Sequence, residues 1–448
     1  MAIGINEILK FLWPALTWLG KFVANWWWVF LTLFLWKKAL SFWLWWRQER
    51  WLNNVYSPVL LEIKLPPEVK KPIEAMENVM AAIHGVVYQP PDWWEYWIDG
   101  QLQTGISFEI VSIGGEIHFY LRFHKDYRNG VEAAIYSQFP EAEIYEVEDY
   151  TKNVPPSIPN KEWDLWGTDY RLFRPDPYPI KTYRHFETKK EKPEEIVDPL
   201  SHLLEGLAKV QEGEQFWLQI RATPIGGAAC PGYPEGTAAE FLKEGEKIKT
   251  KLLRRPQPKK PKPLLQEAIE IWLPGWEPPP SGKSEKEVIP PEMKLSPGEK
   301  EVVEAIERKL SKPAFSCGIR FIFLGKKDVY HKPTLRMAFN FFNCFATNNL
   351  NALYPWGETI TKIKKSWFLP LNLIRKRRLY VRCRKMFKKY KERVDPLYPR
   401  SKKDREVFIL NTEELASLFH FPAWETAPVP GWKRIEAKKG PPPSLPTE

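Results

Sequence analysis

Residues 1–57 constrain this chain more than any other part, because they combine a long uncharged run with an unusual number of tryptophans. Lys21 is the only charged residue between Phe11 and Trp36, and ten of the chain's 22 tryptophans lie in the first 51 residues. A helix of roughly 20 apolar residues crosses the hydrocarbon core of a membrane, and indole rings favour the head-group level. The segment therefore predicts an N-terminal transmembrane anchor.

A cleaved signal peptide and a helix lying flat on the membrane are two other interpretations of this segment. Signal peptides have a basic start and a small-residue cleavage site, whereas Glu7 is the first charged side chain here and Lys and Trp follow the apolar run. Residues 1–20 could instead lie in the interface while residues 22–46 cross the membrane. The sequence leaves open which of these residues cross.

The basic residues around the run set the expected orientation and partners. Only Lys10 precedes the run, whereas four basic residues follow it, Lys37, Lys38, Arg47 and Arg50. The positive-inside rule then places residues 50–448 in the cytoplasm, attached to the inner membrane. The net charge of +11 favours anionic partners such as lipid head groups or DNA. The four cysteines form no CxxC pair, so neither a metal site nor a cofactor is expected.

Residues 58–150 alternate between strand-like and helix-like periods in the order βαββαβ. Ile106, Phe108 and Ile110 alternate with polar residues, and a second alternating run follows the turn at Gly114–Gly115. Helical spacing marks four apolar positions, Ile73, Met76, Met80 and Ile83. This order predicts a ferredoxin-like module and α+β as the fold class.

A looser copy of the same order is expected over residues 151–251 and 299–355. Its first predicted strand is Ile180–Phe186. Residues 252–298, between its two parts, are rich in proline and lysine and predict an exposed insertion. We therefore expect two ferredoxin-like modules, the second of them split.

A basic helical segment is expected over residues 356–410. Eleven Lys and Arg lie between Arg375 and Arg393, with Glu392 as the one acid and apolar residues interleaved. Such a helix can bind phosphate backbones, lie on an anionic membrane, or form a solvated or protein-contacting face, and these alternatives stay open. The candidate contacts with nucleic acid or anionic lipid are Arg375, Lys376, Arg377, Arg378, Arg382, Arg384, Lys385, Lys388 and Lys389.

Residues 411–448 combine a short capped helix with a tail. Asn411 and Glu414 have the spacing of a capping box, in which each side chain bonds the backbone N–H of the other residue. Proline and lysine recur from Val429 onward, which predicts an extended tail.

The string at residues 412–422 resembles the TEELA-x-L-x-HFP element of conjugative DNA-translocation ATPases, which belong to the type IV secretion and HerA/FtsK superfamily. Residues 60–69 are similar to the LLEIKLPPEV string of membrane-anchored relatives, so the resemblance covers most of the chain. In that family the element lies just upstream of the motor. The resemblance therefore implies a motor-docking role for Asn411, Glu414, Leu415, Leu418, Phe419, His420 and Phe421.

One part of the family pattern is missing, because the sequence has no Walker A motif. That motif requires Gly-x-x-x-x-Gly-Lys-Ser/Thr, whereas the nearest string, at residues 281–284, has Glu277 where the first glycine belongs. Paired acids such as Glu194 and Glu195 are better explained as solvated faces, so no catalytic residue is assigned. We expect the chain to stop where the motor would start, with the motor on a separate chain.

These features predict a non-catalytic, membrane-anchored scaffold of a type IV secretion-like machine that moves DNA or protein. Its expected partners are membrane lipid, a motor ATPase of the HerA/FtsK type, DNA and further copies of the chain. The alternative is a membrane-tethered nucleic-acid-binding protein that acts through residues 375–393. Neither function makes the chain itself an enzyme.

Overall fold

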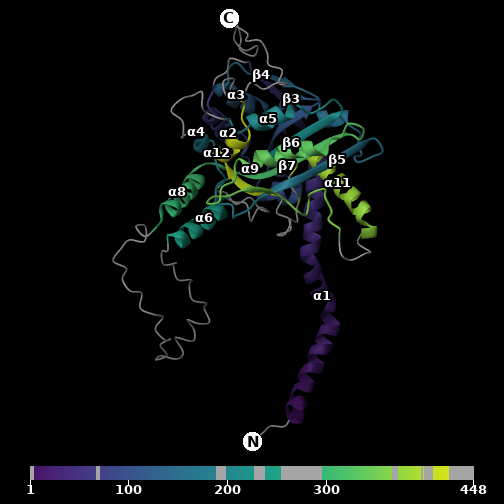
Figure 1. Ribbon diagram of the computed structural model, residues 1–448. Coiled ribbons are helices and arrows are strands. Elements are labelled where there is room, and N and C mark those ends of the chain that lie inside the picture. The colour runs from purple at the N-terminus through teal and green to yellow at the C-terminus, as the bar shows by residue number, and fades with distance from the viewer. Residues whose placement is uncertain are drawn as a thin grey trace, which may run out of the picture. The chain divides into compact units, whose positions relative to one another are not determined.

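The computed structural model describes residues 5–66, 71–187, 198–226, 238–253, 295–365, 372–394, 397 and 407–422 (Figure 1). The chain divides into two compact units. The first comprises Met1–Tyr56, Pro91–Leu102 and Pro396–Arg405, and the second comprises Ser57–Pro90, Gln103–Asp395 and Glu406–Glu448. Most of the predicted insertion, residues 281–284 within it, and the predicted tail lie outside the described residues.

The first unit contains one long helix, α1 (Ile5–Asn54). Among the described residues, no helix has a stretch long and apolar enough to cross a membrane. The predicted transmembrane anchor is therefore wrong. The physical reason is the composition of α1, because its many indole rings are only partly apolar and Lys21, Lys37 and Lys38 interrupt the run.

A short π-helical turn, η1 (Glu95–Asp99), packs against α1 within the first unit. The indole Nε1 of Trp43 donates to the backbone oxygen of Trp97 at 3.1 Å, and Arg47 lies 3.8 Å from Asp99. Gly100 closes the turn with a φ of 76°, and a Cβ there would lie 2.5 Å from the backbone carbon of Arg47. Glycine is therefore required where this turn meets the helix.

The second unit is built on one antiparallel sheet of nine strands. Eight strands lie in the order β4-β1-β3-β2-β6-β7-β5-β8, and β9 pairs with β7. The strands are β1 (Pro58–Lys64), β2 (Ile106–Ile113), β3 (Glu116–His124), β4 (Glu143–Glu146), β5 (Trp163–Leu172), β6 (Glu214–Ile225), β7 (Ala314–Lys326), β8 (Leu353–Pro355) and β9 (Phe408–Asn411). The long strand β7 has β6 on one side, and β5 and β9 share its other side.

The two faces of this sheet differ because successive side chains of a strand point to opposite faces. On one face, apolar side chains of five neighbouring strands stand directly opposite one another, Leu61, Leu121, Phe108, Ile220 and Ile319. All five are buried, so they form the centre of the main hydrophobic core.

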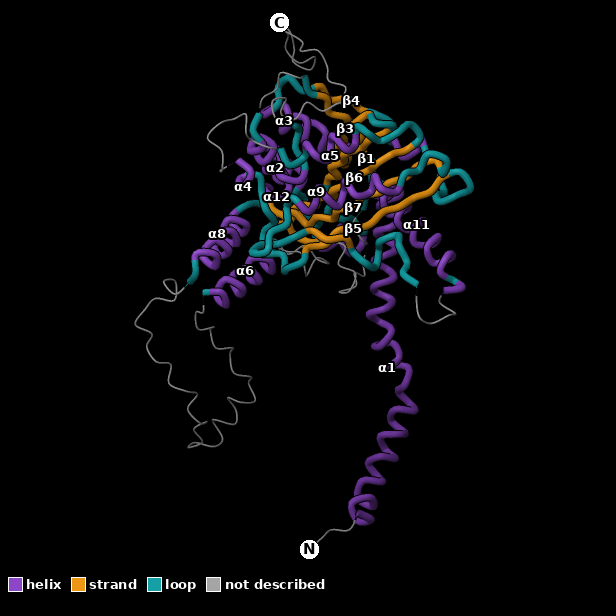
Figure 2. Tube along the Cα trace, in the orientation of Figure 1, coloured by secondary structure: helices purple, strands orange, loops and turns teal. Residues whose placement is uncertain are grey.

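Helices cover both faces (Figure 2). The core face is covered by α2 (Ile73–Val87), α3 (Arg128–Gln138), α5 (Ser201–Leu207), α9 (Arg336–Asn343) and α12 (Thr412–Leu418). Helix α11 (Arg375–Glu392) packs on the opposite face, where its Phe387 stacks on Trp217 of β6. The remaining elements are α4 (Arg184–Glu187), α6 (Ala238–Leu252), α8 (Pro297–Ser311), η2 (Lys125–Tyr127), η3 (Tyr150–Asn153) and η6 (Lys332–Leu335).

The predicted fold class, an anchor followed by two ferredoxin-like modules, is wrong. The strands assigned to the two modules belong to one continuous sheet, because β2 pairs with β6 from Ile106↔Ala222 to Ile113↔Gln215. Pairing of backbone groups at this boundary leaves no free edge between the two halves.

The first strand predicted for the second half is also wrong. Residues 180–186 form no strand and end in helix α4, whereas β5 (Trp163–Leu172) provides the strand. The Thr182 side chain donates to Glu413, and the Tyr183 hydroxyl donates to Glu77. An alternating sequence pattern carries no information about such distant polar partners.

Phe321 provides a test of the core, because it is fully buried and lies within 5.5 Å of the ring centres of both Phe216 and Trp166. Replacing Phe321 by alanine should lower the free energy of unfolding by about 3–5 kcal/mol, since it leaves a cavity in the core. The control is Phe173→Ala, at a side chain that is 74% exposed, with an expected effect below about 0.5 kcal/mol. Urea unfolding followed by circular dichroism measures both, and equal losses would contradict the assigned core.

Candidate functional site

The outer face of α11 carries most of the predicted basic contacts. The helix packs against the sheet through Cys383, Met386, Phe387 and Tyr390, which recur at helical spacing and are buried. Six of the nine predicted residues are exposed on the helix, Lys376, Arg377, Arg378, Arg384, Lys385 and Lys388. The structure therefore brings these cations together on one surface helix.

The other three predicted cations are partly buried, and the hydrogen bonds of Arg375 and Arg382 show how the chain itself holds them. Arg375 Nε donates to the backbone oxygen of Ile363 at 2.8 Å, and Arg382 donates to that of Ile360 at 2.8 Å. Burial, followed by the charge of Arg378, lowers the pKa of Arg382. These two arginines thus fix α11 on the preceding segment, and Lys389, the third, is also only partly exposed.

The C-terminal end of α11 is fixed by Arg393, whose side chain is buried. Its Nε lies 2.6 Å from Glu109 Oε1, and its Nη1 lies 2.5 Å from Asp149 Oδ2. Arg393 also has a φ of 52°, which a residue with a side chain adopts only at a cost. Burial opposes the charge of Arg393, but Glu109 and other anionic neighbours raise its pKa well above the usual value.

The Glu109 carboxylate is fully occupied by further donors. The Tyr150 hydroxyl and the Ser107 hydroxyl each donate to it at 2.7 Å, and Gln219 Nε2 donates at 3.2 Å. Burial, and then the charge of Glu109, raises the pKa of Tyr150, so this phenol stays protonated. A carboxylate enclosed by four partners in this way stabilises the fold and has no free lone pair directed at a substrate.

Glu109 belongs to a row of polar side chains that crosses the sheet on the α11 face. Six neighbouring strands each contribute one directly opposed residue, Glu62, Tyr120, Glu109, Gln219, Arg320 and Asp169. Arg320 Nε lies 2.6 Å from Asp169, and His118 Nδ1 lies 2.7 Å from Glu62. This row was not predicted from the sequence, although acidic residues within apolar strands are a signal of it.

The predicted motor-docking element forms β9 and α12. Asn411 Oδ1 accepts from the Glu414 N–H at 2.8 Å, and the Asn411 N–H donates to Glu414 Oε2 at 3.0 Å, so the predicted capping box is confirmed. All seven predicted docking side chains are buried, Asn411, Glu414, Leu415, Leu418, Phe419, His420 and Phe421. They hold the element against the core, and contact with a partner would have to use neighbouring surface.

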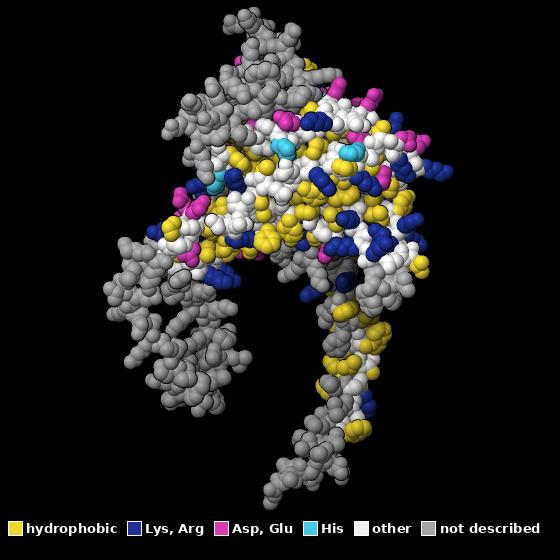
Figure 3. Space-filling view, viewed as in Figure 1, with side chains coloured by type: hydrophobic (Ala, Val, Ile, Leu, Met, Phe, Trp, Pro, Cys, Tyr) yellow, Lys and Arg dark blue, Asp and Glu magenta, His cyan; other side chains and the backbone are white. Residues whose placement is uncertain are grey.

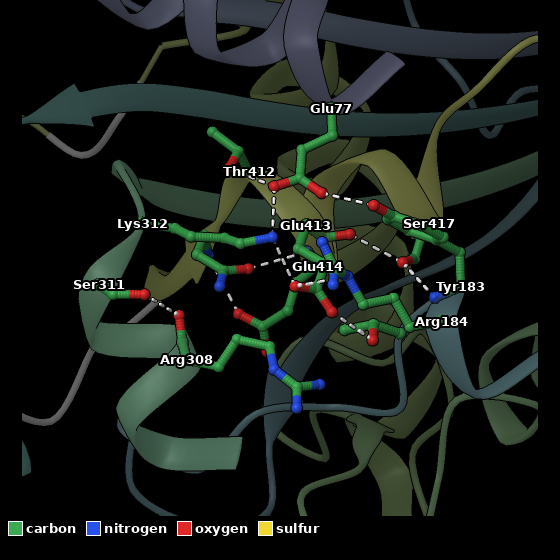
Figure 4. Close-up of polar contacts among 12 residues, drawn as sticks. Glu77, Tyr183, Arg184, Arg308, Ser311, Lys312, Thr412, Glu413, Glu414 and Ser417 are labelled. Carbon is green, nitrogen blue, oxygen red and sulfur yellow. Dashed lines mark hydrogen bonds and ion pairs between the residues drawn. The ribbon is translucent and has the colours of Figure 1, made fainter. Parts of the chain in front are cut away.

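Helix α12 is bound to three other segments by a network of charges (Figure 4). Lys312 Nζ lies 2.6 Å from Glu413 Oε2 and 2.5 Å from Glu77 Oε1. Thr182 donates to Glu413 at 2.6 Å, and the Tyr183 hydroxyl donates to Glu77 at 2.7 Å. Burial alone would raise the pKa of Glu413, but the hydrogen bonds of Lys312 and Thr182 outweigh it and lower that pKa.

A second ion pair lies deeper under the same helix. Lys309 Nζ is 3.0 Å from Glu414 Oε2, and both side chains are completely buried. Burial raises the pKa of Glu414 despite the opposing charge of Lys309. Nearby, His420 Nε2 lies 2.9 Å from Asp198 Oδ1. Each of these polar groups therefore has a partner within the chain, as buried charges require.

Comparison with known proteins gives one family. A family model described as a domain of unknown function (DUF8128) matches residues 48–428, which is most of the chain. No curated protein matches the sequence. The description of the family names no activity, so the resemblance to translocation ATPases stays a prediction.

Arg393 is the first residue to test at this site. Replacing it by methionine should lower the free energy of unfolding by about 3–5 kcal/mol, because Glu109 is left buried without its cation. The double variant with Glu109→Gln should lose less than the sum of the two single variants, since neither partner is then left charged alone. Arg377→Met on the exposed face is the control, and additive losses in urea unfolding would argue against the pair.

Glu413 makes the stability of α12 depend on pH. Its folded-state pKa is lowered from the usual 4.5, so its charge stabilises the fold above pH 4.5 and this contribution is lost as the pH falls through the folded value. Glu413→Gln should therefore be less stable than the natural chain by about 1–3 kcal/mol at pH 7. The difference should shrink below pH 4.5. Glu304→Gln, at an exposed ion pair, is the control, and a gap that stays constant with pH would contradict this account.

Proposed function

We propose that this chain, which belongs to the DUF8128 family, is a non-catalytic scaffold of a type IV secretion-like translocation machine. Its partner in this proposal is a motor ATPase of the HerA/FtsK type. The resemblance of residues 412–422 to the element that precedes such motors suggests the partner, and the chemistry of the buried charges supports the lack of catalysis.

The observation that carries the proposal is that the buried carboxylates of the described residues are engaged within the chain. Cationic or histidine partners hold six of them, Glu62, Glu109, Asp169, Asp198, Glu413 and Glu414, with Asp169 held through Oδ1 while its buried Oδ2 has no hydrogen-bond partner among the described residues. The seventh, Glu214, accepts the His331 N–H at 2.6 Å. A general acid or base must reach a substrate proton, whereas these groups already bind structural partners.

The position of β9 supports a mechanical role for the motor-associated element. Backbone pairing from Ala314↔Asn411 to Cys317↔Phe408 joins β9 to the longest strand of the sheet. Lys312 and Lys309 then bind α12 from the adjoining helix end. A load applied at the C-terminal end of this element would therefore act on the whole sheet, which suits a support for a motor.

Two measurements on the full chain test this proposal. The purified chain should release no phosphate from Mg-ATP above the buffer rate. Affinity capture from native membranes should recover an ATPase of the HerA/FtsK type, identified by mass spectrometry. Lys312→Met should reduce that recovery several-fold, because Lys312 is the shared cation between α12 and α2.

The matched control is Arg128→Ala, which removes a cation from the ion pairs of α3 and should leave the recovery unchanged. ATP hydrolysis by the purified chain would overturn the non-catalytic part of the proposal. Capture without any such ATPase would overturn the part that concerns the machine.

A further inference from the structure

Apolar side chains share the exposed face of α11 with the cations. Arg377, Tyr380, Val381, Arg384 and Lys388 follow the i, i+3, i+4, i+7, i+11 spacing of a single helical face. This spacing places them on one side of the helix, away from its buried residues, and Tyr380 and Val381 are 42% and 43% exposed.

The residues just before the helix extend this apolar character. Leu373 is 86% exposed and Ile374 is 47% exposed. Exposed leucines that stand alone are common on protein surfaces, but a leucine, an isoleucine, a valine and a tyrosine within one helix end form a patch. All four side chains are exposed to solvent in the described structure, and the Arg384 guanidinium lies 5.6 Å from the centre of the Tyr380 ring.

The charged side chains of α11 are almost all positive. Helix α11 carries a single acid, Glu392, which lies at its C-terminal end, 3.5 Å from Lys388. Its exposed arginines and lysines are therefore close to one another, and in Figure 3 dark blue side chains gather where Figure 1 labels α11. An anionic surface would relieve this repulsion.

We propose that the exposed face of α11 binds the surface of a membrane that contains anionic phospholipid. At such a surface, Leu373, Val381 and Tyr380 enter the boundary between head groups and acyl chains. The neighbouring arginines and lysines contact head-group phosphates at the same time. The helix lies in the plane of the interface, with its inner face still packed on the sheet.

The apolar residues favour a lipid surface over nucleic acid. Binding to a phosphate backbone uses the cations alone and leaves Leu373 and Val381 in water. A bilayer surface accommodates both kinds of side chain, which is the combination that the structure presents. The lipid contact does not depend on a motor partner, so it and the proposed scaffold function can fail separately.

Vesicle flotation with the full chain tests this contact. The probes are phosphatidylcholine vesicles with and without phosphatidylglycerol, and 20-base-pair duplex DNA serves as the rival ligand, with a length of about two helical turns. The natural chain should bind the anionic vesicles more tightly, and added salt should weaken that preference. Leu373→Ser combined with Val381→Ser should weaken binding to anionic vesicles at least about fivefold while the charge stays the same.

A charge variant completes the experiment. Neutralising Arg377, Arg384 and Lys388 to glutamine should weaken binding to anionic vesicles by about tenfold or more. The control neutralises three exposed lysines on α6 and α8, Lys243, Lys247 and Lys300, and should bind as the natural chain does. Because all substituted side chains are exposed, thermal melting should show unchanged folding in every variant.

Three results would overturn the proposal. The first is a natural chain that shows no preference for anionic vesicles. The second is a serine variant that binds these vesicles as well as the natural chain. The third is a charge variant that loses duplex DNA binding but keeps vesicle binding, which would assign the face to nucleic acid.

Discussion

The backbone pairing of β2 with β6 is the interaction on which the rest of the second unit depends. Without it, each half of the sheet would end in a long apolar edge strand, which is prone to unwanted pairing. With it, side chains from both halves form one apolar face, and segments late in the chain cover strands that are early. Phe419, for example, packs 5.1 Å from Phe108 and 5.8 Å from Phe119, measured between ring centres.

The pairing of β2 with β6 also explains why Glu109 is buried, although burying a carboxylate is unfavourable in free energy. Glu109 lies on β2 directly opposite Gln219 of β6, so its charge is enclosed as soon as the strands pair. A buried ion pair adds little net stability compared with apolar residues, but removing one partner is strongly unfavourable. The ion pair with Glu109 therefore holds Arg393 in one position, although its left-handed backbone conformation is unfavourable. The C-terminal end of α11 is fixed with it.

Local features of this chain could be predicted from its sequence, whereas long-range pairings could not. Alternation correctly located the strand at Phe108 and the strand that follows Gly114–Gly115, and spacing correctly identified the capping box of Asn411 with Glu414. These signals are carried by neighbouring residues. The pairing of β2 with β6, the place of β5 beside β7, and the contacts of Glu109 with Gln219 and Arg393 join residues more than a hundred positions apart, about which periodicity carries no information.

The exposed face of α11 shows the same difference between local and long-range information. The sequence located the cations of α11, but it could not tell which side of the helix would remain outside. The structure settles this because Cys383, Met386, Phe387 and Tyr390 are held against the sheet, and Arg393 prevents the helix from rotating about its axis. The face that remains is therefore fixed by what lies beneath it. Val381 cannot turn inward to escape water, and Glu392, beside Lys388, is the one acid on this helix. A contact with an anionic lipid surface, as proposed for α11, would use this face without any rearrangement of the helix.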